Sequence, residues 1–472
     1  MLERLEISIL NLNQLENFKD LSSEYYLSEY ILKSKKIRTK RIEKISDISY
    51  VTDGEHGTPD YDNSTNIKYI TAENIRPNYI LDTDFKTISI EQDRKNARAH
   101  LLENDVLVYS VGAYAGFSAK AEKHLFPANI PRSVAIIRPN ELVNSEYLSV
   151  FINSKYGYFQ TQRFRAGNSQ PVLALEKIKQ FEIVILSNYF QTKISEIYNA
   201  SYQLRLLSKT NYSKAETLLL QEIGLDEKIT GLNSVEVTNT NVKKFKESFG
   251  VTGRLDAEYY HPKYENIVKI IKSYKNGFTN LDSFIDNYST GYPFKSESYC
   301  EKGIPLIRIN NISKGNLDIS NSANIPFEDI ELSEKDIAVE NDILISMSGT
   351  IGNSCRIPKG IKAVVNQRIM RFTPKDFDSE VLSLLINSII GYSQLERIGT
   401  GGVQTNISAT DIKNILIPKI KLDKQQAIAQ LIEESFSLKK QSEHLLEVAK
   451  KAVEIAIEES EEVAMKFINE NV

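Results

Sequence analysis

A long internal repeat is the feature that most constrains the fold of this chain. Glu24-Tyr25-Tyr26 returns as Glu258-Tyr259-Tyr260, 234 residues later. Glu103-Asn104-Asp105 returns as Glu340-Asn341-Asp342 at an offset of 237, and Gln191 returns as Gln425 at an offset of 234. Because this period far exceeds that of solenoid repeats, we expect each copy to be a domain followed by a connector.

Each copy changes character along its length. The short β-branched runs at 105–109 and 342–346 predict strands, and residues 145–164 and 379–398 carry apolar side chains at helical spacing. The predicted fold class is α+β, with two mixed α/β domains in a pseudo-two-fold arrangement, separated by a long antiparallel, coiled-coil-like pair of helices. We expect the N-terminal segment and first domain at 1–187, the first long helix and a linker at 188–240, the second domain at 241–421 and the second long helix at 422–472.

The two long helices are predicted from segments 191–223 and 425–457, which contain neither Gly nor Pro. Apolar and small residues repeat there every 3.5 residues on average, which is the spacing of a helix-pairing seam. The apolar seam positions are Ile194, Ile197, Leu204, Ile428, Leu431 and Leu438. Burial of one stripe against the other is the simplest arrangement, and the alternative is that each helix lies on its own domain. A helix of roughly 34 residues is about 50 Å long, close to the length of about fifteen base pairs.

Composition excludes several classes of protein. The formal charge of −4 argues against a uniformly basic nucleic-acid binder, but residues 120–179 hold nine Lys and Arg against four Asp and Glu. Residues 343–421 hold ten against five. No leader or membrane span is evident and the two cysteines lack metal-ligand spacing, so we expect a cytoplasmic protein without a metal or other cofactor. An Asn/Asp-Pro-Pro-aromatic tetrapeptide and a phosphate-binding loop are both missing from the sequence, which argues against an enzyme.

One segment carries a family resemblance. Gly401-Gly402-Val403-Gln404-Thr405-Asn406 precedes a short helix, a strand ending at Pro418 and a long helix led by Gln425. This order resembles the closing signature of the DNA-specificity subunits of type I restriction–modification systems. The first copy has a weaker form, Gly167-Asn168-Ser169-Gln170-Pro171, without the strand-ending proline. Loops at 53–59 and 289–295, here named the leading loops, also resemble the family, and the resemblance covers essentially the whole chain.

The resemblance implies a target-recognition domain in each half, so that each half reads one part of a bipartite DNA site. It also implies that the helices set the spacing and dock two adenine-methyltransferase (modification) subunits. A restriction subunit, an ATP-dependent translocase and nuclease, would then complete the complex, and the chain itself would not be an enzyme. Two alternatives stay open: a duplicated scaffold that does not bind DNA, and a standalone nuclease.

Candidate DNA contacts lie at matching places in the two copies. Base reading requires paired donors and acceptors on loops, whereas Arg and Lys on phosphates mainly fix position. The base-reading candidates are Asp53, His56, Thr58, Tyr61, Asn168, Gln170, Tyr292, Lys295, Gln404, Thr405 and Asn406. The candidates for the DNA backbone are Arg132, Arg163, Arg165, Arg368, Arg371 and Arg397.

Each candidate has a structural alternative. His56 could simply stabilise its own turn, and Gln170 and Gln404 could cap the next helix. An arginine is usually a solvated surface residue, so only the local surplus of basic residues favours phosphate contact. The four tyrosines of the repeated Glu-Tyr-Tyr segments are expected to be apolar anchors and not platforms for stacked bases.

Overall fold

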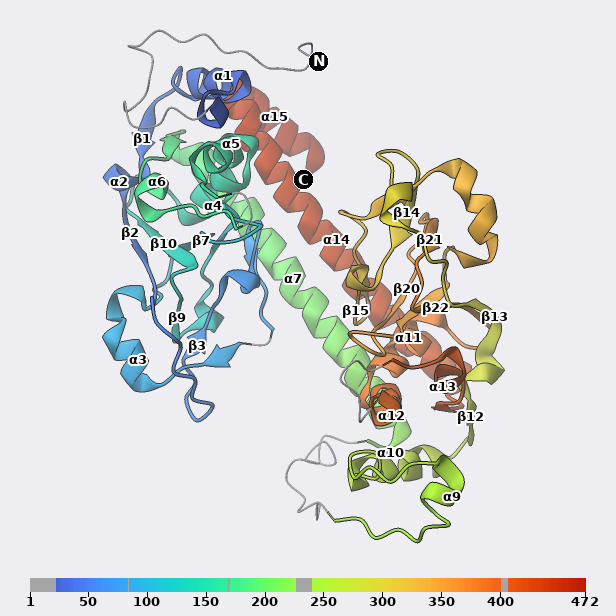
Figure 1. The fold of residues 1–472 in the computed structure, drawn as a ribbon. Helices are drawn as coiled ribbons and strands as arrows, with labels where there is room; N and C mark the ends of the chain where they lie inside the picture. Colours follow the sequence, from blue (N-terminus) through green and yellow to red (C-terminus); the bar gives the residue numbers. More distant parts are fainter. Residues whose placement is uncertain (1–22, 84, 168–169, 226–239, 400–405) are drawn as a thin grey trace. The chain divides into compact units, whose positions relative to one another are not determined.

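The computed structural model describes residues 23–83, 85–167, 170–225, 240–399 and 406–472, which form two compact units. The first unit contains the chain up to Leu206 and from Leu438 to Val472, and the second spans Leu207–Ser437. Each unit combines helices with small sheets, which confirms the predicted mixed class (Figure 1). The four-part division at residues 187, 240 and 421 stays a prediction.

The first unit is built from short strands and short helices. Its strands are β1 Ile42–Lys44, β2 Ser49–Asp53, β3 Lys68–Tyr69, β4 Ile75–Arg76, β5 Tyr79–Ile80, β6 Lys86–Thr87, β7 Val106–Tyr109, β8 Ser118–Lys120, β9 Ala128–Asn129, β10 Val134–Pro139 and β11 Glu182–Val184. Its helices are η2 Ser23–Tyr26, α1 Ser28–Ile37, α2 Ile45–Ile48, η3 Ala72–Asn74, α3 Ile90–Lys95, η4 Ala97–Ala99, η5 Lys123–Leu125, α4 Ser145–Asn153, α5 Lys155–Phe164, α6 Leu175–Ile178 and α15 Glu461–Asn471.

The second unit repeats most of these elements. Its strands are β12 Phe278–Asn280, β13 Ile285–Ser289, β14 Ile304–Ile307, β15 Ile312–Ser313, β16 Asn316–Leu317, β17 Ala323–Ile325, β18 Ile337–Ala338, β19 Ile343–Ser346, β20 Ser354–Arg356, β21 Ala363–Val365, β22 Ile369–Pro374 and β23 Leu416–Pro418. Its helices are α9 Phe249–Thr252, α10 Pro262–Lys272, η7 Leu281–Phe284, η8 Ser296–Ser298, η9 Ile309–Asn311, η10 Phe327–Asp336, α11 Ser379–Asn387, α12 Ile389–Gly399 and α13 Ala409–Lys413.

The two units share one sheet topology. An antiparallel sheet has the order β2-β10-β7-β8 in the first unit and β13-β22-β19-β20 in the second. Strand β3 pairs in parallel with β9, and its counterpart β14 pairs in parallel with β21. Hairpin β4-β5 and pair β1-β11 correspond to hairpin β15-β16 and pair β12-β23. This equality confirms the internal repeat, while the two-fold relation between the copies stays a prediction.

The antiparallel sheet of the first unit is buried on both faces. Val106 and Val108 of β7 pack with Phe151 of α4 in the larger core, whereas Leu107 packs with Ile70 in a second core on the opposite face. Side chains that alternate along a strand therefore serve two cores. This burial fixes the register of β7 against β10 and holds the loops at the strand ends in place.

The helical segments at 145–164 and 379–398 each divide into two helices. Ser154 is the N-cap of α5, and its hydroxyl accepts a hydrogen bond from the Tyr156 backbone N–H. A Cβ at Gly157 would lie 2.2 Å from the backbone oxygen of Ile152, so glycine permits α5 to fold closely against α4. Gly391 has the same relation to Ile386 in the second unit.

The long helices are α7 Asn188–Ile223 and α14 Leu422–Glu458, each a few residues longer than predicted. In the first unit the Oγ atoms of Ser201 and Ser442 lie 2.8 Å apart. In the second unit those of Ser208 and Ser435 lie 3.1 Å apart. From the first contact to the second, the residue number increases along α7 and decreases along α14. The two helices therefore run antiparallel.

Three of the six apolar seam positions belong to the cores of the units. Ile194 and Ile197 join the main core of the first unit, which also contains Ala449 and Ala452, and Ile428 joins that of the second. Leu431 packs partly buried against the second core, and Leu204 and Leu438 are half-buried.

Candidate nucleic-acid interface

A hollow in the first unit collects several of the predicted base-reading residues. Its volume is about 780 Å³. The lining comes from the leading loop, the turn η3, the end of β7, the segment before β10 and the Gly/Gln loop at 167–171. Among the predicted residues it includes His56, Tyr61, Arg132 and Gln170. We name this cavity the first-unit hollow.

The leading loop of the first unit is fixed by its backbone. The Glu55 N–H donates to the Ile130 carbonyl at 3.2 Å, and the Arg132 N–H donates to the Glu55 carbonyl at 2.8 Å. A Cβ at Gly54 would lie 1.7 Å from the Ile130 oxygen, so only glycine permits this close approach. Asn96 and the Gly57 N–H hydrogen-bond the Glu55 carboxylate and lower its pKa, which keeps this carboxylate charged.

Asp53 orients its neighbours. This residue is 9% exposed; its Oδ2 lies 2.9 Å from His56 Nε2, and its Oδ1 lies 3.2 Å from Arg98 Nη2. The carboxylate is therefore engaged within the protein, whereas the His56 side chain is 57% exposed. These contacts favour a supporting role for Asp53, whereas the His56 side chain stays open to solvent.

Tyr61, Gln170 and Thr58 stay open to solvent. Lys86 Nζ lies 4.5 Å from the centre of the Tyr61 ring, and the ring is edge-on to that of Tyr69. Gln170 is exposed at the rim of the first-unit hollow, and the carbonyl of the following residue accepts from Gly112 N–H. Thr58 is exposed but is not part of the lining. Asn168 lies outside the described residues.

The second unit presents the equivalent loops with different side chains. The Tyr292 backbone bridges to β21, since its N–H donates to the Val365 carbonyl, and its ring packs against Phe294 at 4.8 Å. Lys295 is exposed. Asn406 is also exposed and forms an isolated bridge with Ser348, just beyond β19. Gln404 and Thr405 lie outside the described residues.

Three of the arginines predicted to contact phosphates are instead engaged by other groups of the protein. Arg163 is 8% exposed; its Nε donates to the Tyr25 carbonyl and its Nη1 to Ser34. Arg397 likewise donates to the Tyr259 carbonyl at 2.9 Å. Arg371, with a side chain 11% exposed, pairs with the buried Asp342 at 2.8 Å. Their guanidinium groups are occupied within the fold, so these arginines have structural roles.

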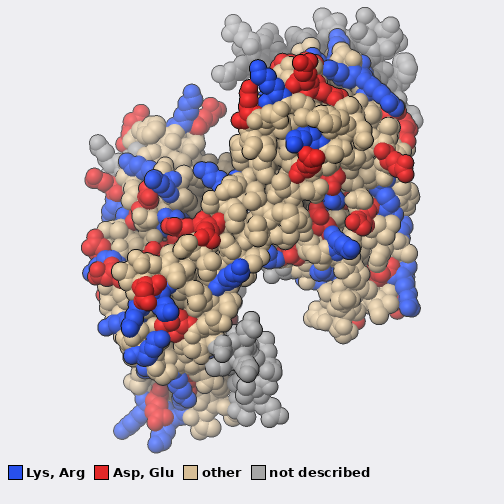
Figure 2. Space-filling view, turned by 180° about the vertical axis from the view of Figure 1, so that it is seen from behind, with Lys and Arg blue, Asp and Glu red and all other residues tan. Residues whose placement is uncertain are grey.

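The other three arginines remain accessible. Arg132, Arg165 and Arg368 are exposed, and Arg132 lines the first-unit hollow. On the face shown in Figure 2, Lys and Arg side chains are interspersed with Asp and Glu side chains. Attraction to phosphates would therefore come from particular accessible arginines more than from the net charge of the chain.

Sequence reasoning missed Glu73 and Arg98. Glu73 is exposed and lines the first-unit hollow, and Arg98 pairs with Asp53. The repeat contained a signal for Glu73, because its counterpart in the second copy is Asn310 while the asparagine that follows both is unchanged. Within the described ranges, no group of three or more His, Cys, Asp or Glu residues is placed to hold a metal ion. None of the described helices combines the length and apolar character needed to cross a membrane.

Comparison with known proteins agrees with this architecture. Residues 265–448 match the type I restriction modification DNA specificity domain. The type I restriction enzyme MjaVIII specificity subunit of Methanocaldococcus jannaschii is 22% identical over 361 residues, which cover 74% of this chain and 77% of that protein. The chain is therefore similar to type I specificity subunits, and its second copy carries the match to their DNA specificity domain. The domain match lies in the second copy, and the repeat extends the same architecture to the first.

Another curated protein and a solved structure are also similar to this chain. The type I restriction enzyme EcoAI specificity subunit of Escherichia coli is 27% identical over 175 residues, 35% of this chain and 29% of that protein. Among solved structures, the S subunit of a type I restriction–modification system from M. genitalium covers 91% of this chain and 95% of its own, at 12% identity and a TM-score of 0.40.

Proposed function

We propose that this specificity subunit recognises a bipartite DNA site, with each copy reading one part. One observation carries the proposal: the same sheet topology occurs twice, and the loops that it holds have different side chains in the two copies. The leading loop offers His56 and Tyr61 in the first copy, and Tyr292 and Lys295 in the second. Different side chains on equivalent loops are suited to reading two different half-sites.

The accessible side chains have the chemistry that DNA recognition requires. Gln and Asn can form paired hydrogen bonds with adenine, and Arg and Lys can contact guanine or phosphate. Gln170 lies in the Gly/Gln loop of the first copy and lines the first-unit hollow with Arg132, and Asn406 and Arg368 are exposed in the corresponding segments of the second copy. We assign base reading to His56, Tyr61 and Gln170 in the first copy and to Tyr292, Lys295 and Asn406 in the second. Asn168, Gln404 and Thr405 belong to the same proposal from sequence alone.

The long helices are proposed to set the distance between the half-sites. Four residues added to α7 alone, or removed from it, would change the seam register with α14 and the distance along the helix. The test is to map methylated adenines genome-wide in cells that produce this subunit with its modification partners. We expect a changed or lost gap between unchanged half-sites, and an unchanged gap would contradict the role of the helices.

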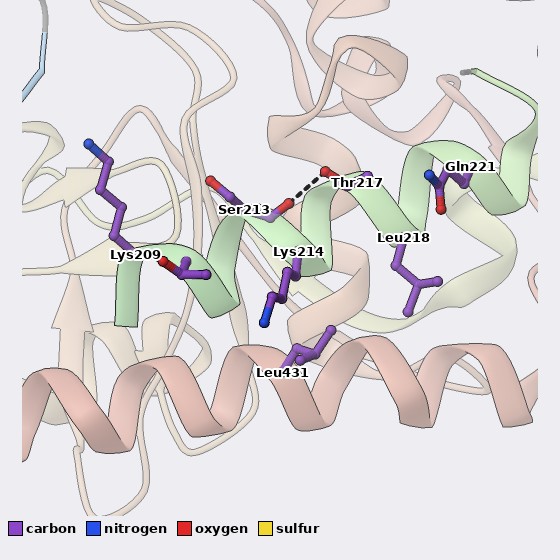
Figure 3. A pocket seen from close by; sticks show the side chains of 8 residues that line it. Lys209, Ser213, Lys214, Thr217, Leu218, Gln221 and Leu431 are labelled. Carbon is purple, nitrogen blue, oxygen red and sulfur yellow. Dashed lines mark hydrogen bonds between the residues drawn. The ribbon is translucent and has the colours of Figure 1, made fainter. Parts of the chain in front are cut away.

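The helices are also proposed to dock the modification subunits. In the second unit an open hollow of about 610 Å³ runs along α7. Figure 3 shows Leu218 of α7 and Leu431 of α14 pointing into it, with Lys214 beside them. An open surface with apolar side chains at its centre and polar side chains around them suits a protein partner. Ser213→Arg, which places a large cation in the lining, is expected to weaken co-purification of the modification subunit, whereas Gln203→Arg on the same helix serves as the control.

In this assembly the methylation and cleavage chemistry belongs to the partner subunits. A restriction subunit that translocates DNA and cleaves it would join the same complex, and all of them would work where the DNA is, in the cytoplasm of the cell. Incubation of the pure chain with plasmid and Mg²⁺ tests the nuclease alternative, and cleavage without partners would contradict the proposal.

Binding to duplex DNA separates the proposal from a scaffold that does not contact DNA. Phosphate contacts release counterions, so the logarithm of affinity should fall linearly with the logarithm of salt concentration. A complex of this subunit with its modification partners is expected to show that slope on a duplex that contains the mapped site. A flat response would favour the scaffold.

A further inference from the structure

The turn η3 and its counterpart η9 have the same hydrogen-bonded backbone structure. In the first unit Asn74 Oδ1 accepts from the Thr71 N–H at 3.0 Å, and the Leu81 N–H donates to the Asn74 carbonyl at 2.7 Å. In the second unit Asn311 Oδ1 accepts from the Arg308 N–H at 2.8 Å, and the Asp318 N–H donates to the Asn311 carbonyl at 2.9 Å. Both turns then continue into a two-stranded hairpin.

Strand pairing places each turn beside a leading loop. In the first unit the segment at β9 accepts hydrogen bonds from Ile70, just before η3, and from Glu55 in the leading loop. In the second unit Asn366 donates to Ile307, just before η9, and the neighbouring Val365 accepts from Tyr292 in the leading loop. One strand therefore holds both the turn and the loop in each copy.

The side chains on this shared backbone structure differ between the copies. Positions that hold Thr71 and Glu73 in the first copy hold Arg308 and Asn310 in the second. Glu73 is exposed and lines the first-unit hollow with His56 and Arg132. Across the described ranges, the Glu73 carboxylate forms no side-chain hydrogen bond or ion pair.

The corresponding side chains of the second unit, Asn310 and Arg308, are also available to a ligand. Asn310 is exposed, and Arg308 lies with its guanidinium 5.9 Å from the centre of the Tyr299 ring. The buried Nε of Arg308 has no hydrogen-bond acceptor among the residues that the structure describes.

We propose that the turns η3 and η9 are a second pair of base-reading loops, an inference that rests on the DNA-recognition function proposed above. A carboxylate repels phosphates, so Glu73 would contribute to discrimination and not to general affinity. In the major groove a carboxylate accepts from the N4 amino group of cytosine, and an arginine donates to O6 and N7 of guanine. Glu73 thus reads a cytosine in the first half-site, and Arg308 reads a guanine in the second.

The test uses the full chain in complex with its modification subunits and a random-sequence duplex library, from which bound sequences are selected. Glu73→Gln replaces an acceptor with a mixed donor and acceptor of equal size. We expect it to lower the preference for cytosine at one position of the first half-site by roughly tenfold or more, with no change at the second half-site. Arg308→Gln should relax one guanine position of the second half-site only.

Glu91→Gln is the matched control, because Glu91 is an exposed carboxylate of the same unit that pairs with Lys95 on α3. It removes the same charge and should leave the selected sequence unchanged. Unchanged base preferences in Glu73→Gln, or an equal loss of affinity for all sequences, would overturn the inference. If the unmodified complex selected no sequence at all, the proposed function itself would fail, so the two failures are distinguishable.

Discussion

The guanidinium of Arg163 lies over the ring of Tyr25, with 4.0 Å between Cζ and the ring centroid, and its Nε donates to the Tyr25 carbonyl at 3.0 Å. Arg397 repeats this relation with Tyr259, at 4.3 Å and 2.9 Å. Both pairs join residues that are 138 positions apart. In each copy an arginine thus fastens the Glu-Tyr-Tyr segment to the helix that precedes the Gly/Gln loop.

Arg163→Ala is expected to destabilise the first unit by about 2–4 kcal/mol, because it removes a cation–π contact and leaves the Tyr25 carbonyl without its donor. Urea unfolding followed by circular dichroism measures the change. Arg165→Ala is the control, because Arg165 is exposed and two residues away. If the Arg163→Ala variant kept full stability but bound DNA more weakly, Arg163 would be a phosphate-contacting residue after all.

The repeat made most of the architecture predictable. Equal offsets indicated two equal domains, and the strands at 106–109 and 343–346 followed from buried β-branched runs. The seam serines predicted helix pairing, because small residues at regular spacing permit close approach. The division of the shorter helices at Ser154 and Ser388 was missed, since helical periodicity continues across a serine that caps the next helix.

The roles of individual arginines could not be read from the sequence. Arg163 and Arg165 are close neighbours in a basic segment, yet one is buried against Tyr25 and the other is exposed. Helix α5 ends at Phe164, so the two side chains leave the backbone in different directions. Such a distinction depends on tertiary packing, which charge counts along the chain do not contain.

A double-mutant cycle at Ser201 and Ser442 tests the seam of the first unit. Ser201 Oγ contacts both the hydroxyl and the carbonyl of Ser442, and both residues are buried. Either single change to alanine should cost about 1 kcal/mol, because it leaves a buried polar group with fewer partners. The double alanine variant should cost less than the sum of the two, as measured by urea unfolding. Strict additivity would mean that the hydroxyls do not interact.

Glu122→Gln is expected to stabilise the first unit at neutral pH. Burial raises the pKa of Glu122, its Oε1 has no hydrogen-bond partner among the described residues, and Lys120 lies 3.8 Å from its other oxygen. A pKa above that of the unfolded chain favours folding at low pH, and this advantage disappears as pH rises through the folded-state pKa. The gain from the substitution should therefore grow from pH 4 upward and reach about 1 kcal/mol near neutrality.

Glu146 is the matched control for that experiment. Burial alone would raise the pKa of Glu146, but a hydrogen bond and ion pair from Lys120 at 2.8 Å outweigh burial and lower it. A lowered pKa stabilises the fold above the unfolded-state value, and the benefit is lost as pH falls. Glu146→Gln should thus destabilise the unit at neutral pH and have less effect in acid, the opposite trend. Thermal unfolding across pH 4–8 measures both, and equal trends would contradict the assignment.

The accessible arginines are expected to act through phosphates. Arg132→Ala and Arg368→Ala should each weaken binding of the assembled complex to all duplexes by a similar factor, because a phosphate contact carries no sequence information. Each should also reduce the slope of log affinity against log salt concentration by about 1. Fluorescence anisotropy at several salt concentrations, on the mapped site and on an unrelated duplex, measures both effects. An arginine whose loss changes only the mapped site would instead read a base, and in that case the slope would change little.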